Sequence, residues 1–176
     1  RYHKWPEEGI GNLVDFQLST LEEYIYIADR TYDWDNMPLV YDVNCSDYQI
    51  NEVAKVMRDL GQAYMVEYGT NETGVSVPGN SGKLETYFNY NYVSGVSQAE
   101  AGSIDNWKAR IKESLDNNCP IPYKSHNNAS GDANHMFVLD GYTDNDYYHF
   151  NWGWSGSGNG WYQLTVMNPL GSDYSW

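Results

Sequence analysis

The hydrophobic pattern changes its period about two thirds of the way along the chain, and no other feature restricts the fold as strongly. Before that point, apolar residues recur at helical spacing. The clearest stripe covers residues 50–60, with Ser46 placed to cap its start and Gly61 placed where a helix usually ends. Shorter stripes cover residues 84–92 and 103–115. These segments predict amphipathic helices whose apolar side chains pack into a core.

The last third has the pattern of short strands. Four β-rich runs are separated by Asp, Asn, Gly and Ser: Pro120–Tyr123, His135–Tyr142, Asp146–Trp152 and Gly160–Val166. Helices followed by an antiparallel meander predict an α+β fold, with helices in the N-terminal half and an antiparallel sheet in the C-terminal half. Because no repeat or linker interrupts the pattern, we expect a single domain over residues 1–176, with one long surface loop at Gly69–Gly82.

The charge balance argues against several classes of partner. The chain has 24 Asp and Glu against 10 Lys and Arg, and a net charge of −14 should repel a nucleic acid backbone. It has no run of 18 apolar residues, so we expect no membrane span. Its 4 scattered His give no reason to expect a metal or another cofactor. The acidic, aromatic-rich, Lys-poor composition favours a secreted protein, and we expect a monomer.

His135 is a candidate general base. It opens a β-rich run and follows a loop of small polar residues, so one side of its ring can meet solvent and the other the core. A general base needs a pKa near the working pH, and imidazole is the side chain best suited to this. The alternative is a structural His with a satisfied hydrogen bond.

Asn151 and Trp152 are the candidate partners of His135. Antiparallel pairing about the turn Thr143–Asn145 brings the end of one run beside the start of the other. The Asn151 amide oxygen could then accept a hydrogen bond from Nδ1–H of the imidazole, and the Trp152 ring could exclude water from it. The alternative is that Asn151 ends a strand and that Trp152 belongs to the core, as we expect of Trp154.

No convincing nucleophile accompanies this pair. Cys45 lies just before a predicted helix, where the helix dipole would lower the pKa of a thiol, but it follows what resembles a plain turn. Cys119 lies in a turn that leads into a strand. We expect neither thiol to be the nucleophile.

Several segments resemble the streptopain family of secreted bacterial cysteine endopeptidases. The most specific are His135–Tyr142 and Tyr148–Trp154, which carry the His and the Asn-Trp-Gly-Trp motif at the family's separation. Other similar segments extend over essentially the whole chain: Arg1–Pro6, Thr31–Pro38, Val53–Gly61, Met65–Gly69, Pro120–Tyr123 and Val166–Pro169.

The resemblance implies a papain-like fold, incomplete at both ends of this chain, and a role for each site residue. His135 would be the general base, Asn151 would orient it, and Trp152 would pack over both. The loop before His135, including Ala133 and Asn134, would form one wall of the substrate cleft. The family's nucleophilic Cys, and the Gln that supports the oxyanion, would lie before residue 1.

We therefore expect a cysteine-type endopeptidase that cleaves proteins or peptides by a Cys-His-Asn mechanism and is secreted as a zymogen with an inhibitory pro-segment. Because the nucleophile would be missing from residues 1–176, we expect the chain alone to be inactive. Two alternatives remain open. One is a secreted carbohydrate-binding or adhesin-like module, which would need exposed Trp side chains. The other is a catalytically dead member of the family.

Overall fold

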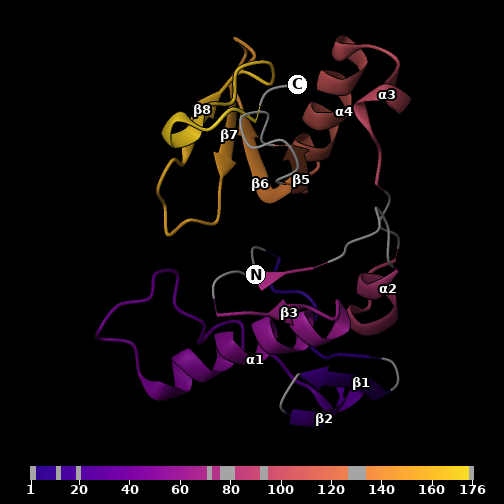
Figure 1. Cartoon of the computed structure of the whole chain (residues 1–176), viewed down its shortest axis with the longest axis vertical. Coiled ribbons are helices and arrows are strands. Elements are labelled where there is room, and N and C mark those ends of the chain that lie inside the picture. The colour runs from indigo at the N-terminus through magenta and orange to yellow at the C-terminus, as the bar shows by residue number, and fades with distance from the viewer. Residues whose placement is uncertain are drawn as a thin grey trace. The chain divides into compact units, whose positions relative to one another are not determined.

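The computed structural model describes residues 3–10, 13–18, 21–70, 73–75, 82–91, 95–126 and 134–174, with the backbone alone for 13–18, 21–26 and 134. The chain forms two compact units, Arg1–Val96 and Ser97–Trp176 (Figure 1). Among the described residues, no helix has both the length and the apolar character needed to cross a membrane.

The first unit combines one long helix with short hairpins. Its elements are β1 (Leu13–Leu18), β2 (Leu21–Tyr26), α1 (Asp47–Ala63), β3 (Glu67–Tyr68), β4 (Thr73–Gly74) and α2 (Lys83–Phe88), with a 3₁₀ turn at Ile27–Asp29. β1 pairs with β2 and β3 with β4, both antiparallel. Neither hairpin was predicted from the sequence, and the single loop predicted at Gly69–Gly82 is wrong where β4 pairs with β3.

Helix α1 begins where the sequence predicts but ends later. Ser46 is its N-cap: its Oγ accepts a hydrogen bond from the Gln49 amide, and the Gln49 side chain accepts one from the Ser46 amide. The helix continues through Gly61 to Ala63. A Cβ at Gly61 would lie 1.8 Å from the Tyr68 hydroxyl, so this glycine allows β3 to approach the helix and does not terminate it.

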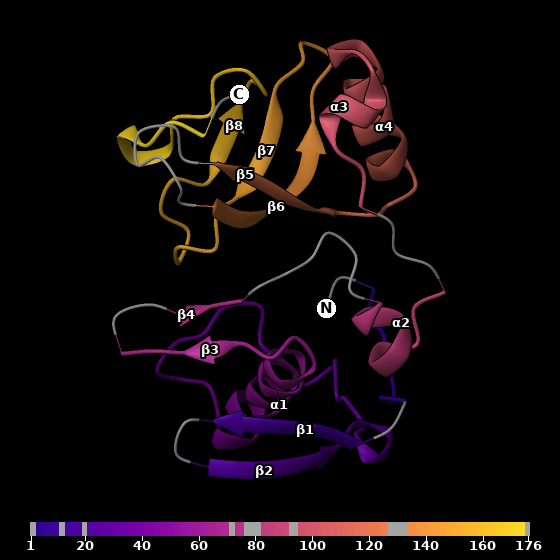
Figure 2. The same cartoon turned by 45° about the vertical axis from the view of Figure 1, so that its right-hand side comes forward.

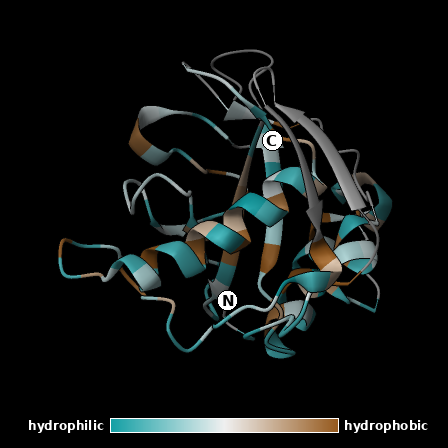
Figure 3. Cartoon of the chain, turned by 90° about the horizontal axis from the view of Figure 1, so that it is seen from below, coloured by the Kyte–Doolittle hydropathy of each residue, from teal (hydrophilic) through white to brown (hydrophobic). Residues whose placement is uncertain are grey.

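The buried face of α1 is rotated from the predicted stripe. Ile50 and Met57 are exposed, whereas Ala63 is fully buried and Val56 packs beside it against Tyr32, Met37 and Phe88. Hydrophilic and hydrophobic stretches alternate along the helix (Figure 3). The buried face also carries two carboxylates, Glu52 and Asp59. An apolar pattern cannot reveal such positions, because buried charge with partners has no apolar signature.

Each of these carboxylates has partners from the segment before the helix. Glu52 accepts hydrogen bonds from the Asp33 amide at 3.1 Å and from the Lys55 ammonium at 2.6 Å. The Asp59 carboxylate accepts from the Tyr32 hydroxyl at 3.0 Å and lies 3.5 Å from Arg30 Nε. Burial raises the pKa of the Asp59 carboxyl, although Tyr32 and Arg30 act in the opposite direction.

The raised pKa of Asp59 predicts a pH-dependent stability. The folded state binds this proton more tightly than the unfolded state, so the stabilisation is complete below the unfolded pKa of about 3.9 and is lost as pH rises through the folded pKa. Urea unfolding from pH 4 to pH 7 should show the wild type losing stability relative to Asp59→Asn. The matched control is Asp29→Asn, at an exposed position. Parallel profiles for wild type and Asp59→Asn would contradict this.

The second unit is a four-stranded antiparallel sheet with helices on one side (Figure 2). Its elements are α3 (Gln98–Ala101), α4 (Ile104–Asp116), β5 (Ile121–His126), β6 (Asn134–Tyr142), β7 (Tyr148–Asn151), β8 (Gly160–Tyr162) and a 3₁₀ turn at Pro169–Gly171. The strand order is β5-β6-β7-β8. This meander, and the helix that Ser103 caps, confirm the predicted α+β architecture.

One face of this sheet forms the core of the second unit. Side chains from β5, β6 and β7 pack there against Ile111 of α4, and they are buried: Tyr123, Phe137, Leu139, Tyr148 and Phe150. The segment after β7 adds Trp152, and the C-terminal segment adds Leu164, Met167 and Tyr174. This aromatic core buries apolar surface and so stabilises the second unit.

Two lysines of α4 hold the turn between β6 and β7. Lys108 and Lys112 lie 2.9 Å and 2.8 Å from the Asp146 carboxylate oxygens. Hydrogen bonds from the two ammonium groups lower the pKa of Asp146. The pairs therefore stabilise the unit above the unfolded pKa of Asp146, and this stabilisation is lost as pH falls through the lowered folded pKa.

Asp146→Asn should reduce the free energy of unfolding by about 1 kcal/mol at pH 7, because partly exposed ion pairs contribute little individually. Asn suits the left-handed backbone at this position, where φ is 60°. Chemical denaturation checks this, with Asp144→Asn in the same turn as the control. Equal losses in the two variants would show that the lysine pairs do not matter.

Candidate functional site

His135 lies on the core face of β6. Residues 135, 137 and 139 alternate toward that face, and Phe137 and Leu139 are buried there. The imidazole is only half-buried, because it stands near the start of the strand at the margin of the core. The ring therefore meets the core on one side and remains accessible on the other, as the sequence predicts.

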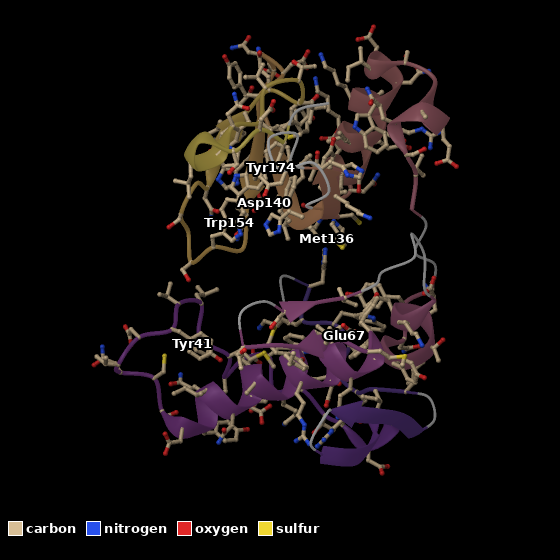
Figure 4. All side chains as sticks on the ribbon, in the orientation of Figure 1. Tyr41, Glu67, Met136, Asp140, Trp154 and Tyr174 are labelled. Atoms are coloured by element: carbon tan, nitrogen blue, oxygen red, sulfur yellow. The ribbon has the colours of Figure 1, made fainter. Side chains whose placement is uncertain are left out.

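Aromatic rings surround the imidazole. The Trp154 ring stacks on it at 4.8 Å between centroids with an angle of 20° between the planes, and the Trp152 ring lies parallel to it at 6.3 Å. The Tyr174 ring lies 5.9 Å away and also contacts Trp154 (Figure 4). These contacts restrict the rotation of the imidazole and exclude water from its inner side.

Two of these aromatic residues have roles that the sequence analysis did not assign. Trp154 packs against the core as expected, and it also stacks on the imidazole. No pattern in the sequence ties Tyr174 to the imidazole. Its amide donates to the Met167 carbonyl at 2.8 Å, and its own carbonyl accepts from the Ser125 hydroxyl at 2.7 Å. These bonds fix the C-terminal segment over the start of β6.

The hydrogen bond of the imidazole determines which nitrogen can act as a base. His135 Nε2 lies 2.8 Å from the Trp152 carbonyl oxygen. A carbonyl oxygen only accepts, so Nε2 must carry the proton of this bond. In the neutral ring, Nδ1 is then unprotonated and has a free lone pair. The geometry thus prepares Nδ1, and not Nε2, to take a proton from another group.

Asn151 does not contact the imidazole in the way the sequence analysis expected. It pairs with Val138 and is exposed, whereas its neighbours Phe150 and Trp152 are buried. Strand alternation therefore puts Asn151 on the outer face of the sheet and His135 on the core face. The Asn151 Oδ1 atom accepts instead from the Gly153 amide at 3.0 Å. The Trp152 carbonyl takes the position that was expected for the Asn151 amide oxygen.

The structure describes the other three expected site residues to different extents. Ala133 lies outside the described residues, and for Asn134 the structure gives the backbone alone, at the start of β6 opposite His126. Trp152 is fully buried and lies beside His135 through both its ring and its carbonyl.

Cys119, the cysteine of the second unit, lies far from His135 along the sheet. Cys119 precedes β5, in which Ser125 is the residue opposite His135. At about 3.3 Å per residue, the six residues from Cys119 to Ser125 span roughly 20 Å. The Cys45 thiol lies in a local turn, 3.6 Å from the Val40 carbonyl and 3.9 Å from the Asp42 carboxylate.

His149 lies on the outer face of the same sheet. A bulge at Asp140 turns that carboxylate toward it, and His149 Nδ1 lies 2.6 Å from Asp140 Oδ1. The exposed Trp161 ring forms a T-shaped contact with the imidazole, 5.2 Å between centroids. This pair ties β6 to β7 and is separate from the His135 cluster. In the described part of the chain, no group of three or more His, Cys, Asp or Glu side chains could hold a metal ion.

Comparison with known proteins shows the family of this chain. The family model described as the Peptidase C10 family matches residues 1–162. The chain belongs to the Peptidase C10 family. Streptopain from Streptococcus pyogenes serotype M1 is 29% identical over 179 residues, which cover 96% of this C10 chain and 44% of streptopain. The thiol protease/hemagglutinin PrtT of Porphyromonas gingivalis is 29% identical over 96% of the chain and 19% of PrtT.

Solved structures of cysteine proteases share the fold of this C10 chain. The active wild-type interpain A of Prevotella intermedia has a TM-score of 0.86 at 28% identity, over 99% of this chain and 74% of interpain A. A prointerpain A fragment from the same organism has a TM-score of 0.78 at 29% identity, over 93% of this chain and 52% of the fragment. The resemblance to streptopain is confirmed, and the chain spans less than half the length of streptopain.

The site geometry predicts unequal costs for two tryptophans of the C10 chain. Trp152→Ala should reduce the free energy of unfolding by about 3–5 kcal/mol, because it empties a fully buried position under Phe137. Trp161→Ala, on the exposed outer face, should cost less than about 1 kcal/mol. Denaturant unfolding of both variants checks this. Similar costs would mean that Trp152 does not support the core beneath His135.

Proposed function

We propose that this chain is the histidine-bearing part of a secreted cysteine endopeptidase. The observation that carries the proposal is the 2.8 Å contact between His135 Nε2 and the Trp152 carbonyl, which leaves Nδ1 as the free base. A cysteine peptidase needs an imidazole that accepts the thiol proton on one nitrogen and is held by a hydrogen bond on the other. Membership of the Peptidase C10 family supports the same assignment.

In this mechanism, His135 Nδ1 takes the proton of a cysteine thiol, and the resulting thiolate attacks the carbonyl carbon of the scissile peptide bond. The Trp152 carbonyl stabilises the imidazolium, because a hydrogen bond from a charged donor is stronger than one from a neutral donor. The imidazolium then gives its proton to the leaving amine, which leaves an acyl-enzyme. A water molecule, deprotonated by Nδ1, hydrolyses that thioester and restores the thiol.

The nucleophile in this proposal is supplied by a segment outside residues 1–176. Ser125 of β5 is the residue opposite His135, and most of β5 lies between it and Cys119. The Cys45 thiol contacts the Val40 carbonyl within its local turn. The chain also spans only 44% of streptopain, so streptopain is long enough to include a further segment that could carry the nucleophile. The chain by itself should therefore not cleave peptides.

The same proposal includes a substrate cleft beside His135 and an inhibitory pro-segment. By resemblance to streptopain, the residues before β6 would form a wall of the cleft beside His135, with a preference for an apolar residue two positions before the scissile bond. An inhibitory pro-segment is supported by the similarity to a prointerpain A fragment. The carbohydrate-binding alternative has one exposed tryptophan of the sheet in its favour, Trp161, but it is not favoured because Trp152 is fully buried and Trp154 packs on His135.

The decisive experiment extends the chain with its natural upstream coding segment and measures hydrolysis of casein. We expect activity that iodoacetamide abolishes and that His135→Ala reduces at least about a thousandfold, because the thiol then lacks its base. The double variant Cys45→Ser, Cys119→Ser serves as the control and should retain activity. Cleavage by residues 1–176 alone, after alkylation of both cysteines, would contradict the proposal.

A further inference from the structure

The backbone that receives the imidazole hydrogen bond is itself held by side chains on either side. The peptide group between Trp152 and Gly153 donates its N–H to Asn151 Oδ1 at 3.0 Å and accepts from His135 Nε2 through its carbonyl. The preceding peptide group donates the Trp152 N–H to Asn159 Oδ1, also at 3.0 Å. Two consecutive peptide groups are thus fixed by two asparagines.

Asn159 reaches Trp152 from the far end of the turn between β7 and β8. Two backbone bonds shape this turn: Ser157 N to the Trp154 carbonyl at 2.9 Å, and Asn159 N to the Gly156 carbonyl at 3.2 Å. Neither bond reaches the Trp152 amide. Because β7 ends at Asn151, the Trp152 amide lies beyond the regular strand pairing, and the Asn159 side chain satisfies it.

We propose that Asn159 is a positioning residue for His135, acting through the backbone of Trp152. Its amide oxygen fixes the orientation of the peptide before Trp152, and Asn151 fixes the peptide after it, so the Trp152 carbonyl stays directed at Nε2. This inference rests on the proposed function, in which Nδ1 is the base, and adds a residue to the same site. Asn159 itself does not touch the reacting atoms.

The chemical consequence is control of the imidazole tautomer. While the Trp152 carbonyl is directed at the ring, the neutral imidazole keeps its proton on Nε2. If the peptide can rotate, this bond weakens, and the tautomer with the proton on Nδ1 becomes populated. That tautomer has no lone pair on Nδ1 and cannot accept a thiol proton.

The experiment records long-range ¹H–¹⁵N spectra of His135 in the full chain, at a pH where the ring is neutral, with His135→Gln used to assign the signals. In the wild type, Nε2 should show the shift of a protonated nitrogen and Nδ1 that of an unprotonated one. In Asn159→Ala, the two shifts should move toward each other, and the Nε2 proton should exchange with solvent about three- to tenfold faster, as expected for one lost hydrogen bond.

Two further variants separate positioning from general stability. Asn159→Asp keeps an acceptor at the same distance and should retain the wild-type tautomer. Asn145→Ala removes an exposed asparagine at the turn between β6 and β7 and should also leave the tautomer unchanged. Near-ultraviolet circular dichroism verifies that each variant keeps the aromatic core. Should Asn159→Ala fail to fold, Asn159→Ser replaces it, because the shorter hydroxyl cannot span the same distance.

The proposal is overturned if a folded Asn159→Ala or Asn159→Ser variant keeps the Nε2 proton with unchanged exchange, or if Asn159→Asp behaves like Asn159→Ala. This readout does not depend on peptide cleavage. A failure of the extended chain to hydrolyse casein would therefore count against the proposed function alone, and an unchanged tautomer would count against the role of Asn159 alone.

Discussion

The hydrogen bond between His135 and the Trp152 carbonyl is the interaction on which the site depends. The Trp152 carbonyl belongs to the main chain and its peptide is held by Asn151 and Asn159, so it has less rotational freedom than an unconstrained amide side chain. It assigns the proton to Nε2 and leaves Nδ1 for chemistry. The position of Trp152 is in turn fixed by the burial of its ring in the core of the second unit. The packing of the Trp152 ring therefore also determines which imidazole nitrogen of His135 carries the proton.

The core face of the sheet explains why this arrangement is possible. The ring centroids of Phe137 and Trp152 lie 4.2 Å apart, and the Trp154 ring stacks on His135. The segment after β7 therefore packs its aromatic rings against side chains of β6. Tyr174 closes the cluster from the C-terminal segment. A polar imidazole can remain at the edge of such a core because its one inward-facing polar atom has a partner. Its other nitrogen does not take part in this bond and is the base in the proposed mechanism.

The sequence predicts the secondary-structure elements of the fold better than the contacts between side chains. Ser46 as a helix cap, the four strand runs and the proximity of Trp152 to His135 follow from local patterns of period and turn chemistry. The outward orientation of Asn151 also follows from strand alternation, which puts it on the face opposite Phe150, and the expected contact with His135 was wrong for this reason. Tyr174 lies 39 positions from His135 and carries no pattern that ties it to the imidazole. The buried Asp59 is likewise invisible to a search for apolar faces, because its burial depends on partners far along the chain.

The most direct test of the account is a crystal structure of the enzyme extended to include its nucleophile, at a resolution that defines the imidazole and its hydrogen-bond partners. The account predicts His135 Nε2 within hydrogen-bond distance of the Trp152 carbonyl oxygen, and Nδ1 as the ring nitrogen nearest the cysteine sulfur. An imidazole held by the Asn151 side chain, or one that presents Nε2 to the sulfur, would contradict it.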